Sequence, residues 1–209
     1  MPLQNRVTPD GSIIATPERG MMMGNRGGCL HTPQRTLSGR PWRTKAWIGC
    51  RLEFKGRNRR IMSLGSYTEL FFLDEATALA AGHRPCFECR RAEAFRFAEL
   101  WALAAGRSGL ARATEIDRAL HAQRLDEHGG KRTHRSQLYA LPDGAFIRTL
   151  AGPALLWGDT LLPWSAAGYG AAEPYDPDDE ADVLTPSGII DVMKLGYTPM
   201  LHESARVSR

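Results

Sequence analysis

The sequence predicts an α+β fold, in which a small zinc-binding α/β unit packs with a second layer of helices and a β-meander. Strand patterns with Pro-Asp-Gly turns occur near both ends of the chain, and helical patterns lie between them. A Cys-x-x-Cys pair follows the first of those helices. The 209 residues are enough for one good-sized core or two small ones. We therefore expect a metal-binding unit at 1–112 and an α+β region at 113–209 that can share its core.

The first half is expected to consist mainly of strands and loops. Pro9 and Gly11 form a turn, because proline presets φ and glycine supplies a positive φ. Asp74 is the predicted N-cap of a short helix, and Gly82 occupies its C′ position. The expected elements are a hairpin at 5–16, a Gly-rich loop at 18–28, strands at 42–54 and 67–73, and a helix at 75–81.

The second half is expected to begin with helices and to continue as a β-meander. Thr114 and Asp117 form a pattern like a capping box. Thr185, Pro186 and Gly196 bracket the last helix as its N-cap, first position and C′ position. The expected elements are helices at 92–105 and 115–128, strands within 140–169, an acidic loop at 173–182 and a helix at 187–195.

Charge is unevenly distributed around a formal net value of +4. Residues 1–112 hold 18 Lys and Arg against 9 Asp and Glu, whereas residues 113–209 hold 9 against 14. All four cysteines lie in the basic half, and a basic surface around a small metal site is typical of nucleic-acid binding. The sequence contains no apolar run of membrane-spanning length and no apolar N-terminal leader. We therefore expect a cytoplasmic protein with no membrane partner.

The cysteines predict a structural zinc site. In the cytosol, a Cys-x-x-Cys pair is more often a metal site or a redox pair than a disulfide. Cys86 and Cys89 can bind the same Zn²⁺, and Cys50 is the obvious third ligand. Cys29 and His31 are both candidates for the fourth, because side chains two residues apart in an extended segment share a face. The redox alternative is less well supported, since thioredoxin-like pairs follow a strand and this pair follows a helix end.

The stretch EATALAAGHRPCFECRR, residues 75–91, resembles the N-terminal metal-binding domain of Ada-type DNA methylphosphotriester repair proteins. That family has a helix reading close to EALAAGxRPCxxC, preceded by a strand. The resemblance covers about residues 45–92. The matching residues are Glu75, Ala76, Ala78, Leu79, Ala80, Ala81, Gly82, Arg84, Pro85, Cys86 and Cys89.

The resemblance implies a four-ligand zinc site on a small α/β domain that contacts DNA phosphates. In the family, one ligand cysteine is also the nucleophile that accepts a methyl group, and Cys50 matches its position. This chain departs from the family at the next ligand, because Phe54 stands where the second cysteine of a Cys-x-x-x-Cys pair is expected. It also lacks the downstream helix-turn-helix and the alkyltransferase motif. The zinc scaffold is therefore carried over more safely than methyl transfer.

Basic residues beside the cysteines are candidate nucleic-acid contacts, because guanidinium groups pair well with phosphate. The alternative is that they form a solvated face without a ligand. If the cysteine segments hold one metal ion, these residues meet in space. The candidates are Arg51, Lys55, Arg57, Arg59, Arg60, Arg84, Arg90 and Arg91.

Three further polar residues are candidate catalytic groups. Asp117, His121 and Arg124 fall on one stripe of the predicted helix, which would either line a cleft or form an exposed face. The segment GMMMGNRGG has no nucleotide-binding fingerprint, so no nucleotide cofactor is expected.

The first functional hypothesis is a zinc-binding protein that binds DNA or another nucleic acid, with a role in DNA repair implied by the Ada resemblance. The alternatives are a nucleic-acid-processing hydrolase or transferase, and a structural zinc domain for protein contacts. The last is favoured if the arginines pair with the acidic segment 173–182.

Overall fold

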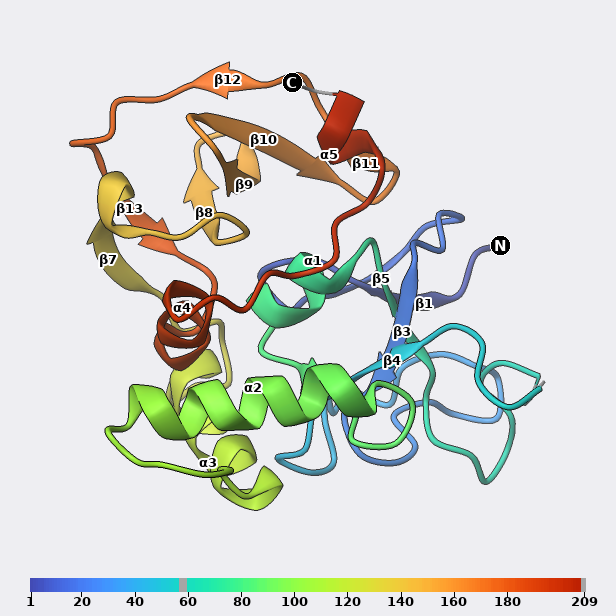
Figure 1. The fold of residues 1–209 in the computed structure, drawn as a ribbon. Helices are drawn as coiled ribbons and strands as arrows, with labels where there is room; N and C mark the ends of the chain where they lie inside the picture. Colours follow the sequence, from blue (N-terminus) through green and yellow to red (C-terminus); the bar gives the residue numbers. More distant parts are fainter. Residues whose placement is uncertain (57–59, 208–209) are drawn as a thin grey trace.

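The computed structural model in Figure 1 describes residues 1–56 and 60–207. Across these residues the strands form two sheets, with helices beside and between them, which confirms the α+β class. The elements in chain order are β1 (Gln4–Val7), β2 (Ile13–Ala15), β3 (Met22–Asn25), β4 (Ile48–Arg51), β5 (Leu70–Phe72), α1 (Glu75–Ala80), β6 (Arg84–Pro85), α2 (Arg91–Ala104), α3 (Ala113–Arg124), β7 (His134–Gln137), the 3₁₀ turn η1 (Leu138–Ala140), β8 (Phe146–Thr149), β9 (Gly152–Trp157), β10 (Thr160–Ser165), β11 (Gly168–Tyr169), β12 (Glu173–Pro174), β13 (Glu180–Val183), α4 (Ser187–Lys194) and α5 (Ser204–Val207).

The first sheet has the strand order β2-β1-β5-β3-β4-β6 among the described residues. The expected hairpin at its edge is confirmed, since β1 and β2 pair antiparallel. The expected loop at 18–28 is wrong in its centre, where β3 pairs antiparallel with both β4 and β5. Gly24 explains how β3, whose residues have low strand preference, fits between β4 and β5. A Cβ on Gly24 would lie 2.2 Å from the carbonyl oxygen of Ile48, so this close strand pairing requires glycine.

The second sheet carries the expected meander, β8-β9-β10-β11, in which successive strands pair antiparallel. The acidic segment 173–182 is not wholly a loop as expected. Its start forms β12, which pairs with β10, and its end lies in β13, which pairs with both β7 and β8. Pairing on two sides makes the sequence adopt a strand despite its many carboxylates, which have low strand preference.

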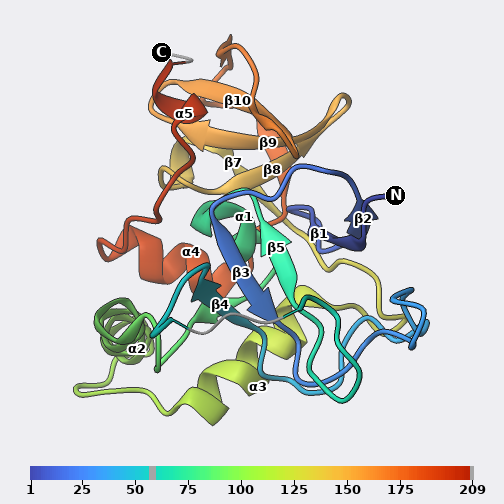
Figure 2. The ribbon, with the colours of Figure 1, turned by 90° about the vertical axis from the view of Figure 1, so that its right-hand side faces the viewer.

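Helix α1 lies between the two sheets (Figure 2). The predicted N-cap is confirmed, since Asp74 accepts a hydrogen bond from the backbone N–H of Thr77. All six residues of the helix are buried. Ala78 packs toward the first sheet, Ala76 toward the second, and Leu79 toward the longer helices. Small alanine side chains let three packing layers approach one short helix.

The longer helices α2, α3 and α4 pack together in one apolar cluster. Phe97 of α2 stacks on Trp101 and meets the ring of Tyr197 edge-on. Helix α3 ends at Arg124, earlier than the expected end at residue 128. The cluster joins residues before and after position 112, so the two halves share a core at this place.

Candidate metal centre and its cavity

Three of the four cysteines converge on one point. The Sγ atoms of Cys50, Cys86 and Cys89 all lie within 4.8 Å of one another. Cys50 belongs to β4, and Cys86 follows β6 directly, where the two strands pair in parallel. The backbone N–H of Cys86 donates to the carbonyl oxygen of Gly49 (3.0 Å), which ties the Cys-x-x-Cys segment to the strand that carries Cys50. The fold therefore brings together ligands separated by 36 positions in the sequence.

Backbone donors point at these sulfur atoms. The N–H of Glu88 donates to Cys86 Sγ, and the N–H of Arg51 donates to Cys89 Sγ, each at 3.4 Å. Hydrogen bonds from Cys50 and Cys89 lower the pKa of the Cys86 thiol, whereas the bond with Cys86 raises the pKa of Cys50. The lowered pKa of Cys86 favours its thiolate, the form that binds metals.

The three residues fit a metal ion. Three soft thiolate donors at this spacing suit Zn²⁺, which takes sulfur ligands at about 2.3 Å. Within the part of the chain that the structure describes, they are the only group of three or more His, Cys, Asp or Glu residues close enough to share an ion. The predicted three-cysteine set is therefore brought together in the fold, as a site able to hold a metal.

Neither predicted candidate for the fourth ligand joins this group. His31 Nδ1 lies 2.7 Å from Thr68 Oγ1, and its Nε2 lies 3.3 Å from the carbonyl oxygen of Ser63. The thiol of Cys29 donates to the carbonyl oxygen of His31 (3.2 Å). Both residues thus have partners elsewhere, and they lie outside the cluster of Cys50, Cys86 and Cys89.

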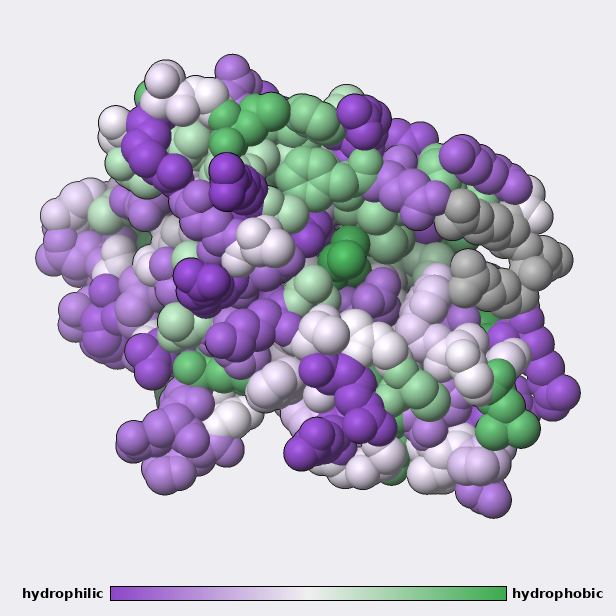
Figure 3. All heavy atoms as spheres, turned by 90° about the horizontal axis from the view of Figure 1, so that it is seen from below, coloured by the Kyte–Doolittle hydropathy of each residue, from purple (hydrophilic) through white to green (hydrophobic). Residues whose placement is uncertain are grey.

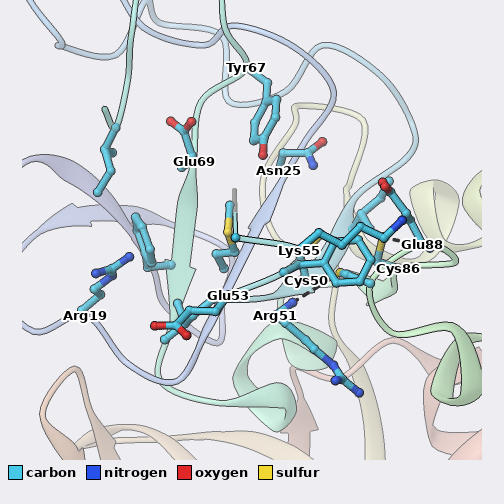
Figure 4. A pocket seen from close by; sticks show the side chains of 18 residues that line it. Arg19, Asn25, Cys50, Arg51, Glu53, Lys55, Tyr67, Glu69, Cys86 and Glu88 are labelled. Carbon is cyan, nitrogen blue, oxygen red and sulfur yellow. Dashed lines mark hydrogen bonds between the residues drawn. The ribbon is translucent and has the colours of Figure 1, made fainter. Parts of the chain in front are cut away.

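The three cysteines line a cavity of about 890 Å³ (Figure 4). Its floor is one face of the first sheet. Met23 faces both Phe71 and Cys50 in register, and all three side chains line the cavity. Asn25 lies two residues after Met23 and Glu69 two residues before Phe71 on the antiparallel neighbour, so they share this face. The volume is within the roughly 300–1,000 Å³ typical of small-molecule sites.

Two of the predicted phosphate contacts, Arg84 and Arg90, lie in buried ion pairs. Arg84 donates to both carboxylate oxygens of Asp117, at 2.8 and 2.9 Å. Arg90 donates in the same bidentate way to Glu75, at 2.7 and 2.8 Å. Both arginines are about 5% exposed, so their guanidinium groups neutralise buried carboxylates and cannot reach a ligand in solvent.

The predicted catalytic stripe is also structural. Asp117 is committed to Arg84, and Arg124 is buried, where it donates to the carbonyl oxygens of Gly82 and Lys45. His121 Nδ1 lies 3.1 Å from a guanidinium nitrogen of Arg124. Burial and the nearby Arg124 charge lower the pKa of His121. Asp117 and Arg124 therefore connect α3 to the first half of the chain through buried contacts.

The other predicted cations that the structure describes are exposed. Arg51 and Lys55 line the cavity with the cysteines, and Arg60 and Arg91 lie on the surface. Arg57 and Arg59 lie outside the described residues. The acidic segment 173–182 has its ion pairs elsewhere, where Glu180 and Asp182 both contact Arg135.

Two cavity residues were missed by the sequence patterns. Glu69 and Arg19 contribute to its wall, and Figure 4 shows them on the side away from the cysteines. For Glu69, the one sequence signal of a functional role lies in the segment from Tyr67 to Phe71. A charged residue that alternates with apolar ones next to a buried strand points to a functional face.

No protein-family model, curated protein or solved structure matches this chain. Among the described residues, no helix has both the length and the apolar character that crossing a membrane requires.

Proposed function

We propose that the protein is a zinc protein that binds nucleic acid at the mouth of this cavity. The observation that carries the proposal is the meeting of two features in one place. Three convergent thiols line the cavity, and the exposed cations Arg51 and Lys55 line it beside them. A cluster of thiolates favours zinc as the bound ion, and exposed cations around it favour a partner that carries phosphate.

The zinc would be held by Cys50, Cys86 and Cys89. Three protein ligands leave one position of a tetrahedral ion for water or substrate, which is the pattern of reactive zinc sites. When bound, the ion would supply Lewis acidity and keep the sulfur atoms as thiolates. The N–H donors of Glu88 and Arg51 hold two of those sulfur atoms in place.

The phosphate contacts would come from the cations that remain exposed. The Arg51 side chain is 58% exposed, and its ion pair with Glu93 is long at 3.5 Å. A pair of this kind contributes little to stability, so a phosphate can replace it at small cost. Lys55 stands over the ring of Phe54, with its ammonium 5.1 Å from the ring centre.

The alternative of a nucleic-acid-processing enzyme is less well supported, because Asp117 and Arg124 of its proposed catalytic stripe make buried contacts within the protein. The alternative of a structural domain for protein contacts is favoured if the arginines near the cysteines pair with the acidic segment 173–182. Glu180 and Asp182 of that segment contact Arg135 instead. Nucleic-acid binding is the hypothesis that the exposed cations still support.

Salt titration of single-stranded DNA binding tests the proposal. The double variant Arg51→Ala/Lys55→Ala is expected to bind more weakly. The slope of log Kd against log salt should fall by about 1.4, because each lost phosphate contact on a single strand accounts for about 0.7.

The matched control is Arg112→Ala/Arg118→Ala, which removes the same charge from exposed positions at the start of α3 and within it. Helix α3 lies on a face that is largely hydrophilic, as Figure 3 shows from below. For this control variant, the slope of log Kd against log salt should stay close to that of the unaltered protein. Equal slopes in the two double variants would contradict a cavity-mouth site.

A further inference from the structure

Among the described residues, one carboxylate oxygen in the cavity wall has no hydrogen-bond partner. Glu69 is 4% exposed, and its Oε2 accepts a hydrogen bond from the backbone N–H of Met62 at 2.8 Å. Its Oε1 is buried and has no hydrogen-bond partner within residues 1–56 and 60–207. A buried carboxylate oxygen that accepts nothing costs free energy, so its retention calls for a donor that arrives from elsewhere.

Glu69 shares its cavity with the thiols. It lies on the same face of the sheet as Cys50, with β3 between their chains. Two strand spacings and a register offset of two residues separate them by about 12 Å, which leaves room for a small molecule between the acid and the cysteines. Figure 4 shows Glu69, Asn25 and Tyr67 on one side of the cavity and the cysteines on the other.

The chemistry of Glu69 selects its ligand. An ionised carboxylate only accepts hydrogen bonds, so it repels phosphate and attracts N–H groups. The phosphate of a ligand would therefore lie toward Arg51 and Lys55, and an N–H group would lie toward Glu69. Asn25 uses its Oδ1 to accept from the N–H of Gly27 at 3.0 Å, which leaves its amide nitrogen as a donor.

We propose that the cavity takes one nucleotide of a single strand, and that Glu69 accepts a hydrogen bond from the exocyclic amine of its base. The base is thus cytosine, adenine or guanine. Uracil and thymine fit less well, because their only ring N–H lies between two carbonyl oxygens that a carboxylate repels. This assignment rests on the proposed nucleic-acid function and names the substrate feature that the site reads.

The experiment compares two matched ligand pairs by calorimetry on the zinc-loaded protein. The pairs are cytidine with uridine 5′-monophosphate, and adenosine with inosine 5′-monophosphate, where an amine replaces a carbonyl. The amino member of at least one pair should bind about tenfold tighter, which corresponds to about 1.4 kcal/mol. Ribose 5-phosphate, which lacks a base, should bind most weakly.

The variant Glu69→Gln should reduce that preference to less than about twofold. Its carboxamide can still accept from Met62, and it can turn its amine toward a carbonyl on the base. Glu53→Gln is the matched control, because Glu53 is an exposed carboxylate on the same cavity wall and should keep the preference. Should Glu69→Gln fail to fold, the four ligands on the unaltered protein still test the proposal.

Equal affinities within both pairs would overturn the proposal, as would no measurable mononucleotide binding or a preference that survives in Glu69→Gln. Salt-dependent DNA binding separates the two hypotheses. If it persists and depends on Arg51 and Lys55 while the bases are not distinguished, only the role of Glu69 fails. If salt-dependent binding is absent as well, the proposed function fails with it.

Discussion

At the scale of single residues, neighbouring arginines have unlike environments. Arg90 is buried against Glu75, whose carboxylate also accepts from the hydroxyl of Tyr197 (2.6 Å) and the N–H of Met200 (3.0 Å). Arg91, the next residue, is exposed, and its guanidinium lies over the ring of Phe95. The sequence shows two adjacent arginines but not the carboxylate that faces one of them. Arg84 and Arg90 are therefore engaged in buried ion pairs, whereas Arg91 stays a predicted phosphate contact.

Replacing each arginine by methionine separates the two roles. Arg90→Met leaves Glu75 as an unpaired buried charge and should lower the free energy of unfolding by about 3–5 kcal/mol. Arg91→Met should change it by less than about 0.5 kcal/mol. Chemical denaturation of both variants provides the measurement. Equal stabilities would show that the Glu75–Arg90 pair does not hold the fold together.

At the scale of elements, local rules predicted the parts whose stabilisation is local. The cap at Asp74 and the turn at Gly11 depend on side chains within a few residues, and both α1 and the β1–β2 hairpin are confirmed. Strand β3 was missed because its pairing with β4 and β5 supplies what Met22–Asn25 lacks in strand preference. The same reasoning explains the site. Cys-x-x-Cys is a local motif, whereas Glu69 acquires its place only when the sheet forms.

The end of α1 provides a matched test of such long-range packing. Gly82 and Gly106 both follow a helix with positive φ, of 87° and 69°. A Cβ on Gly82 would lie 2.5 Å from Cδ of Arg124, whereas one on Gly106 would meet nothing within 4 Å. Gly106→Ala should destabilise by about 1 kcal/mol, the cost of positive φ for alanine. Gly82→Ala should cost clearly more in thermal unfolding, and an equal cost in the two variants would contradict the close packing against α3.

At the scale of the whole molecule, the division of charge between the halves takes part in packing. Asp117 from the acidic half neutralises Arg84 of the basic half, and the hydroxyl of Tyr169 donates a hydrogen bond to the carboxylate of Asp74. Helix α1 contributes to three apolar clusters, and two of them draw on both halves. These contacts fix β4 and β6 side by side, and that pairing positions the cysteines. The metal site therefore depends on the complete fold as much as on its own motif.

The most direct measurement is the zinc content of the purified protein and of four serine variants. One zinc ion per chain is expected in the unaltered protein. Cys50→Ser, Cys86→Ser and Cys89→Ser should each lose most of it, because each removes one of the three converging thiolates. Cys29→Ser is the matched control and should keep its zinc, since Cys29 lies outside the cluster. An unaltered protein without zinc, or equal loss in Cys29→Ser, would contradict the three-cysteine site.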